Sequence, residues 1–266
     1  MKGFAIALAR LAAGWFDRRS RELVGRLDRD VGSLLSLWVM AIAAFGALKV
    51  SFAPLAPGSV AEWLAMWLPY LLLAAAPLAG YRIACACFLD GVPAGQPSLR
   101  LCRWGKWRDL DVLSVRANPL YGPAGFLASL TAGILLNVPF RSIEFLLAMP
   151  AVALRSPDWA HTIVHVMTID VIVMNFFYMV CFVMALRSAP LFPRMLVFVW
   201  LIDIVMQLQI ASWIAATPDM PQTIAPALHN LLEGNIQKVL ISAFIWLPYI
   251  ILSDRVNLTY RHRVPV

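Results

Sequence analysis

Long apolar runs alternate with short polar segments along most of the chain. Six of these runs approach or exceed the roughly 20 residues that a helix needs to cross the hydrocarbon core of a bilayer. They cover residues 34–53, 61–88, 120–138, 163–186, 195–216 and 236–252. The pattern predicts an all-α, polytopic helical membrane protein with about six transmembrane helices. The second run contains Pro69 and Pro77, which predict a tilted or kinked helix.

Two further segments carry apolar residues without the length of a span. Residues 1–33 hold an apolar stripe at helical spacing followed by arginines, which predicts a basic amphipathic helix in the cytoplasmic interface. A helix that docks on a partner is the alternative. The stripe consists of Phe4, Leu8, Leu11 and Trp15. The segment 140–147 after Pro139 is short and charged. It either lies along the outer surface or extends the third span.

The composition agrees with a membrane protein. Hydrophobic residues make up 61% of the chain, charged residues only 14%, and the mean hydropathy is +0.74. A soluble domain of this size carries more polar surface. The net charge of +7 is typical of basic loops that meet anionic headgroups. The expected partners are the lipid bilayer and other membrane proteins or a larger complex. No separate basic domain points to nucleic acid.

The basic residues also predict the orientation. Eighteen of the 22 lysines and arginines fall on the side of the termini, and the other four are Lys49, Arg141, Arg155 and Lys238. Because basic residues collect in cytoplasmic loops, both termini are predicted to be cytoplasmic. An even number of spans agrees with that arrangement. The predicted location is the cell inner membrane.

The cysteines predict no metal site. Cys85 and Cys87 lie two residues apart, which places them on different faces of a helix. Cys102 falls in a loop assigned to the cytoplasm, where thiols stay reduced. The expected role of the cysteines is structural, and no cofactor is predicted.

Polar residues inside predicted spans are the first candidates for function, because such groups are costly in a bilayer. Asp170 and Asn175 lie in the fourth span, and Asp203 and Gln207 lie one turn apart in the fifth. We expect them to form one polar cluster between helices. One interpretation is a proton- or cation-linked site. The other is a hydrogen-bonded clamp in which Asp170 reaches Arg141.

Histidines on the outer side are the second candidate. His161 and His165 lie one turn apart, and His229 lies on the same side with Glu233 one turn later. Such a set can hold a divalent metal if the two segments meet. Ordinary interfacial polarity is the alternative. The chain contains no nucleophile elbow, phosphate loop or zinc-protease motif, so the sequence assigns no catalytic residue and does not support an enzyme.

Short motifs recur through the second half of the chain. They are Gly125-Phe126-Leu127, Pro139-Phe140-Arg141, Asn175, Phe192-Pro193, and a closing run with Trp246, Pro248, Tyr249, Ser253, Arg255 and Thr259. In this order, residues 122–260 resemble the YdgK-like family, a bacterial domain of unknown function with four membrane helices. The resemblance implies that Pro139 and Arg141 end the first of these helices. The chain departs from the family where Tyr260 replaces the usual Phe and where Arg187 alone remains of a basic cluster before Phe192.

The resemblance implies the last of three expected parts of the chain, and the apolar pattern predicts the other two. Residues 118–266 form the four-helix membrane domain, 34–117 form a two-span extension with a basic cytoplasmic loop, and 1–33 form the interfacial helix. In the closing run, Trp246 and Tyr249 are expected to anchor in headgroups. Arg255 and Thr259 are expected to share a face with the turn at 187–194.

No activity, cofactor or catalytic residue comes with the family. The leading hypothesis is a non-enzymatic accessory or assembly component of membrane or envelope machinery. The first alternative is a small ion-coupled transporter that uses Asp170 and Asp203. The second is an outer-facing metal or signal sensor that uses His161, His165 and His229.

Overall fold

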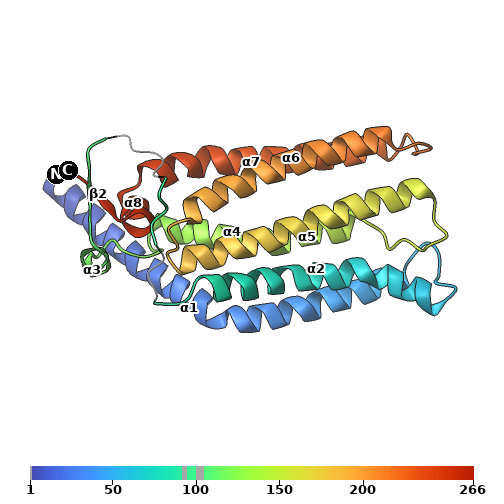
Figure 1. Cartoon of the computed structure of the whole chain (residues 1–266), viewed down its shortest axis with the longest axis horizontal. Coiled ribbons are helices and arrows are strands. Elements are labelled where there is room, and N and C mark those ends of the chain that lie inside the picture. The colour runs from blue at the N-terminus through green and yellow to red at the C-terminus, as the bar shows by residue number, and fades with distance from the viewer. Residues whose placement is uncertain (1, 92–94, 100–104) are drawn as a thin grey trace.

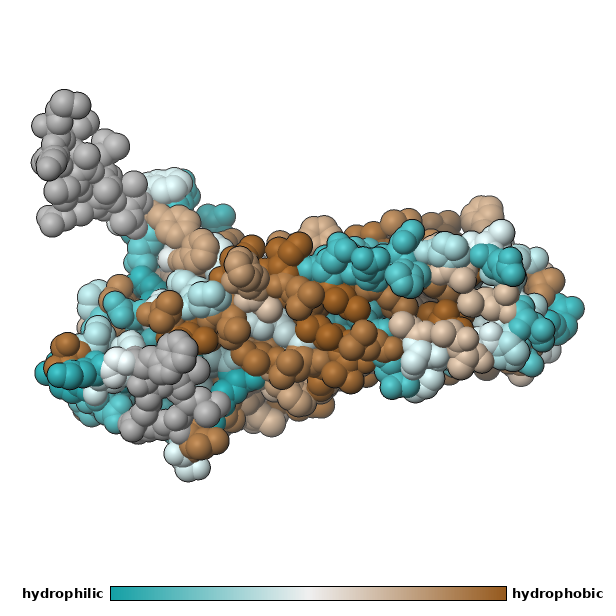
Figure 2. Space-filling model, turned by 90° about the horizontal axis from the view of Figure 1, so that it is seen from above, coloured by the Kyte–Doolittle hydropathy of each residue, from teal (hydrophilic) through white to brown (hydrophobic). Residues whose placement is uncertain are grey.

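The computed structural model describes residues 2–91, 95–99 and 105–266, and it describes the side chains from Leu11 onward except those of residues 12 and 13. Within these ranges, six helices are long and apolar enough to cross a membrane. They are α1 Lys2–Ser51, α2 Val60–Cys87, α4 Phe126–Ala148, α5 Asp158–Leu186, α6 Phe192–Ala216 and α7 Ala225–Leu252. The structure confirms an all-α, multi-pass membrane protein. In Figure 2, hydrophobic residues fill much of the middle of the face shown, interrupted by one hydrophilic patch along an edge, and hydrophilic residues also gather at both ends.

Both ends of the chain lie at one end of the bundle (Figure 1), here called the terminal end; the opposite end is the distal end. Small elements gather at the terminal end. The helix α3 spans Val112–Ala117, α8 spans Asp254–Arg261, and the strands β1 and β2 span Trp107–Asp109 and Arg263–Pro265. The two strands pair antiparallel, which ties the segment before α3 to the last residues of the chain.

The first helix is longer than predicted. Helix α1 runs without a break from Lys2 to Ser51, so no helix end falls at residue 33, and the division into an interfacial part and a span there stays a prediction. Its first part crosses the terminal end obliquely and its second part lies along the bundle (Figure 1). Gly25 and Gly32 are its only helix-weakening residues near that boundary. Each costs about 1 kcal/mol relative to alanine, which is too little to end a helix that packs on its neighbours.

Helix α4 continues through Pro139 to Ala148. The prediction that Pro139 and Arg141 end this helix is therefore wrong, and the segment 140–147 extends the third span. A proline in a helix removes one backbone donor and costs about 3 kcal/mol. The extensive packing of α4 against α5 offsets this cost. As a result, Arg141 lies inside a spanning helix.

The first two spans pack directly on the later ones. Helix α2 makes its most extensive contact with α5. At Gly80 the two backbones approach so closely that an added Cβ would lie 2.6 Å from the carbonyl oxygen of Phe176. The division at residue 118 therefore does not separate two packing units.

The apolar interior is divided by a polar layer. One core cluster, toward the terminal end, includes Phe182, Phe192 and Tyr260. The other, toward the distal end, includes Tyr70 and Phe145. On α4, α6 and α7, polar side chains lie between the residues of one apolar cluster and those of the other. These polar residues are Arg141 on α4, Asp203 and Gln207 on α6, and Asn235 on α7.

Candidate functional site

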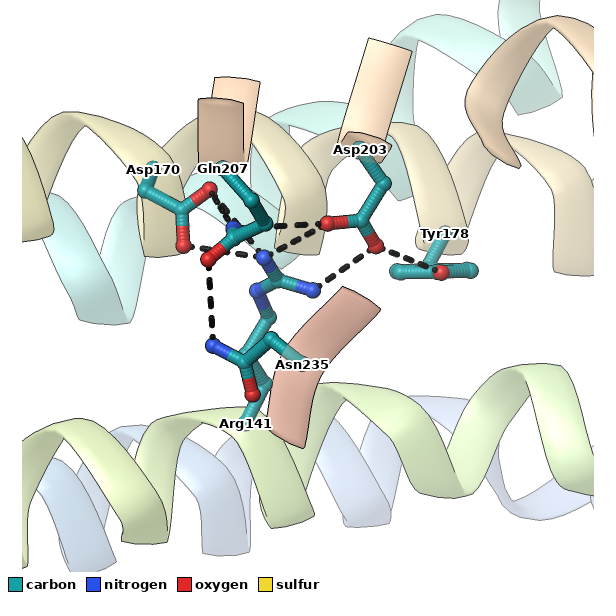
Figure 3. A network of polar contacts seen from close by, with 6 residues as sticks. All are labelled: Arg141, Asp170, Tyr178, Asp203, Gln207 and Asn235. Carbon is teal, nitrogen blue, oxygen red and sulfur yellow. Dashed lines mark hydrogen bonds and ion pairs between the residues drawn. The ribbon is translucent and has the colours of Figure 1, made fainter. Parts of the chain in front are cut away.

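The side chain of Arg141 projects from α4 into the space between α5, α6 and α7 (Figure 3). Its two terminal nitrogens donate a bidentate pair of hydrogen bonds to Asp203, with Nη1 2.8 Å from Oδ2 and Nη2 2.8 Å from Oδ1. The side chain of Asp203 is fully buried. Such a fork-to-fork pair is among the strongest and most directional hydrogen-bonded contacts in proteins.

Asp170 of α5 binds the same guanidinium. Nη2 of Arg141 lies 3.1 Å from Oδ1 and 2.9 Å from Oδ2 of Asp170. The Asp170 side chain is 3% exposed. Two buried carboxylates thus share one cation, and the trio carries one negative charge in excess when both carboxylates are ionised. The proposed contact between Asp170 and Arg141 is present.

Three neutral side chains complete the cluster. Gln207 donates to Asp170 Oδ1 over 2.9 Å, and Asn235 of α7 donates to Gln207 Oε1 over 3.3 Å. The Tyr178 hydroxyl donates to Asp203 Oδ2 over 3.1 Å. The network therefore joins α4, α5, α6 and α7. We call it the Arg141 cluster; it comprises Arg141, Asp170, Tyr178, Asp203, Gln207 and Asn235 (Figure 3).

The position of the cluster explains why its polar groups bind one another. Asp203 lies eleven residues after the start of α6 at Phe192, which is about 17 Å along the helix axis. That is close to the middle of a hydrocarbon core about 30 Å thick. Bulk water is absent there, so most buried polar groups need a partner within the protein.

Asn175 is not part of this cluster, so the expectation of one group with Asp170, Asp203 and Gln207 is wrong in this respect. Its Nδ2 donates to Ser142 Oγ over 2.7 Å, and Ser142 donates to the carbonyl of Val138. Five residues separate Asn175 from Asp170 on α5, which turns its side chain toward a different part of α4. This bond is a separate link between α4 and α5.

Sequence reasoning missed Tyr178 and Asn235 as members and placed Arg141 on the outer side. An arginine between two apolar runs can belong to a loop or to a helix, and the proline before it favoured the loop. The one signal that pointed to Arg141 was the need of Asp170 for a cation. Tyr178 and Asn235 carry no such signal, because a single hydroxyl or amide is common in spanning helices.

The space around the cluster is small. A cavity of about 10 Å³ lies against Arg141, Asp170 and Asn235, enough for about one water molecule. The Nε of Arg141 is buried and has no hydrogen-bond partner among the described residues. In this conformation the cavity has no room for a substrate larger than water.

The histidines are not brought together. Across the described part of the chain, no group of three or more His, Cys, Asp or Glu side chains can hold a metal ion. His161 and His165 lie on α5 beside α2, where they help to line an apolar cavity with Pro69. His229 is exposed on α7 and lies 3.8 Å from Glu233. The predicted metal site with His161, His165 and His229 is therefore not assembled, because the first two side chains face α2 whereas His229 is exposed on α7.

The closing motif forms a structural cap at the terminal end. Ser253 ends α7 and accepts a hydrogen bond from the backbone of Val256 at the start of α8. Arg255 Nη2 lies 2.5 Å from Asp17 Oδ1 of α1, and Thr259 accepts a hydrogen bond from the Gly122 backbone over 3.2 Å. The expected shared face with the turn at 187–194 is wrong for these residues.

The opposite face of α8 contacts that turn instead. The Tyr260 hydroxyl donates to the carbonyl of Ala185 over 3.2 Å, and its ring lies 4.9 Å from that of Phe192. Phe192 and Pro193 begin α6. Residues 256–260 of α8 are all buried, so the helix packs on several sides and joins the α5–α6 turn to α1 and to the start of α4.

Trp246 and Tyr249 pack on the protein. Their rings lie 4.9 Å and 5.3 Å from that of Phe126 at the start of α4. Both side chains are half-buried, so they serve helix packing as well as any contact with headgroups. Pro248 lies within α7, which continues to Leu252.

Comparison with known proteins adds no assignment. No family model, no curated protein and no solved structure matches this chain, and the resemblance of residues 122–260 to the YdgK-like family stays a prediction.

Proposed function

We propose that the protein is a non-enzymatic, multi-pass component of the bacterial inner membrane that acts as an accessory or assembly protein of membrane or envelope machinery. The asymmetry of the basic residues supports a cytoplasmic location for the terminal end. The Arg141 cluster is the observation that carries the proposal, because it has the geometry of a clamp between helices.

The saturation of the carboxylates supports a structural role. All four carboxylate oxygens of Asp170 and Asp203 accept bonds from Arg141, and three of them accept a second bond from Gln207 or Tyr178. A carboxylate that binds and releases an ion must exchange such contacts for others. A saturated pair instead fixes the relative positions of the helices that carry it.

A variant of the Arg141 cluster without its three charges can distinguish a structural role of the cluster from ion binding. The triple variant Arg141→Met, Asp170→Asn, Asp203→Asn removes all three charges and keeps amides for Gln207 and Tyr178. We expect this variant, tagged and produced at native level, to be recovered from mild detergent in the same larger species as the wild type. The measurement is the native mass of the species, with chemical cross-linking. A wild-type chain that is recovered repeatedly as a monomer would refute the assembly role.

The excess negative charge favours an ion-coupled carrier as the second candidate. Uptake of one proton or one monovalent cation neutralises the trio of Arg141, Asp170 and Asp203. The test is proton flux into vesicles that hold a pH-sensitive dye and the purified protein. A carrier gives flux with the wild type and none with the triple variant. Equal flux from wild-type, variant and empty vesicles removes this candidate.

A further inference from the structure

A cavity of about 300 Å³ opens at the terminal end, between the start of α6, the end of α7 and the α8–β2 segment. Its lining is apolar on one side and basic on the other. The apolar side includes Val197, Leu247 and Ile251, and the basic side is formed by Arg194, Arg261 and Arg263. None of the described residues that line this cavity is acidic. We call it the arginine pocket.

Two of the arginines are held in place by one side chain. Asn257 Oδ1 accepts from Arg261 Nη1 over 2.8 Å and from Arg263 Nε over 2.9 Å. Arg261 also donates to the carbonyl of Ile250 over 2.9 Å. The guanidinium of Arg263 lies 4.6 Å from the centre of the Trp107 ring. Their positions are set by the fold, so binding an anion costs little side-chain ordering.

The third arginine lies at the boundary between the apolar span and water. Arg194 lies two residues after the start of α6, and Ile251 lies one residue before the end of α7. Val197 and Leu247 lie about one turn further into the spans. The basic side of the pocket is thus at the level of lipid headgroups, and the apolar side is at the level of the acyl chains.

We propose that the arginine pocket binds an anionic phospholipid of the adjacent leaflet. The phosphodiester lies against Arg194 and Arg261, the buried Arg263 adds its positive charge to the same side, and an acyl chain lies along Val197 and Leu247. Arginine forms charge-assisted, bidentate bonds with phosphate, and basic pockets between spanning helices are recognised sites for anionic headgroups. A soluble anion would leave the apolar side unused. The inference does not depend on the accessory role or on the Arg141 cluster.

Lipid binding to the purified full chain tests the proposal. The protein is delipidated in detergent, and bound phosphatidylglycerol and phosphatidylcholine are counted by native mass spectrometry over a range of lipid concentrations. We expect a preference for phosphatidylglycerol, reduced about fivefold by Arg194→Gln. Arg18→Gln is the matched control, because Arg18 is exposed at the same end and outside the pocket. It should leave the preference unchanged.

Two further experiments test the apolar side of the arginine pocket. Val197→Phe, which fills the pocket and changes no charge, should also lower phosphatidylglycerol binding. Glycerol phosphate, which carries the headgroup chemistry without acyl chains, should compete poorly. Equal binding of the two lipids, equal effects of Arg194→Gln and Arg18→Gln, or full competition by glycerol phosphate would each overturn the proposal.

Discussion

Arg255 and Asp17 lie 238 residues apart in the chain, and their side chains meet at 2.5 Å. The pair joins α8 to the first part of α1. Next to it, Ser20 accepts a hydrogen bond of 2.7 Å from the backbone of Gly125. Gly125 adopts a φ of +61°, and a Cβ added there would lie 3.5 Å from Nε of Arg255. The oblique part of α1 is therefore held by the chain's own C-terminal segment.

Removal of this ion pair should loosen the first part of α1. Asp17→Asn leaves the mostly buried Arg255 without its anion and should lower the free energy of unfolding by about 1.5–3 kcal/mol. The measurements are thermal unfolding in detergent and proteolysis of residues 11–30. Arg19→Gln, in an exposed pair with Glu22, is the control and should change stability by less than about 1 kcal/mol. Equal effects of the two variants would contradict the assignment.

Among the residues of the Arg141 cluster, replacement of Arg141 should lower the free energy of unfolding the most. Arg141→Met leaves two carboxylates buried without a cation, and the expected loss of stability is about 3–5 kcal/mol. Arg141→Lys keeps the charge but cannot form the bidentate pair with Asp203, so its loss should be smaller. Unfolding of the wild type and the three variants in the same detergent gives the order. The triple neutral variant should be more stable than Arg141→Met; the reverse order would show that the network is not a clamp.

Gly80 should not tolerate a side chain. A Cβ there meets the backbone of Phe176 at 2.6 Å, so Gly80→Ala must push α2 away from α5. Overpacking of this kind costs about 1–3 kcal/mol. Gly133→Ala in α4 is the control, because a Cβ there meets nothing within 4 Å. It should be neutral or stabilise by up to about 1 kcal/mol. Melting temperatures of both variants provide the comparison.

The Asp90–Arg187 pair should contribute stability that depends on pH. The pair has a separation of 2.6 Å, and its hydrogen bond from Arg187 lowers the pKa of the Asp90 carboxyl below its usual value. A lowered folded-state pKa means that the contribution is complete above about pH 5 and is lost as the pH falls below about 4. The Asp90 side chain is 79% exposed, so the contribution is at most about 1 kcal/mol.

The difference in the free energy of unfolding between the wild type and Asp90→Asn, measured from pH 3 to pH 7, should be constant above about pH 5 and shrink as the pH falls below about 4. A difference that stays constant across the whole range would show that the carboxylate charge plays no part.

Cysteine labelling should reveal the orientation. Cys87 is exposed at the end of α2, at the terminal end, whereas Cys181 is buried. In a background with Cys85→Ser and Cys102→Ser, an impermeant maleimide should label Cys87 in inside-out vesicles only. In a second variant, Cys87→Ser with Ser156→Cys in the distal loop before α5, labelling should occur in right-side-out vesicles only. The opposite pattern would place the termini outside.

The number of spans and the polar residues of α5 and α6 could be predicted from the sequence because bilayer thickness sets a length that apolar runs must meet. The limits of α1 and α4 could not be predicted from the same pattern. A glycine or a proline weakens a helix locally, but packing that is not visible in the sequence decides whether the helix continues. Arg141 was misplaced for this reason, and with it the centre of the cluster.

The segments that α8 contacts could not be predicted from the sequence either. Arg255 and Thr259 share a face by spacing, but whether that face meets the turn at 187–194 or the segments at Asp17 and Gly122 depends on the direction in which α8 leaves α7. Ser253 sets that direction, since it ends one helix and caps the next. A side-chain cap can be recognised in a sequence, whereas the angle that it produces cannot.

The polar layer between the two apolar cores has a consequence for biogenesis. Arg141 precedes Asp170 and Asp203 in the chain, so α4 reaches the bilayer before the helices that carry its counterions. A charged residue at mid-depth costs about 2.5–3.5 kcal/mol during insertion. That cost is recovered only when α5 and α6 arrive and the three charges meet. A chain that stalls after α4 exposes an unpaired arginine to lipid, a state that the insertion machinery or a membrane protease can distinguish from the finished bundle.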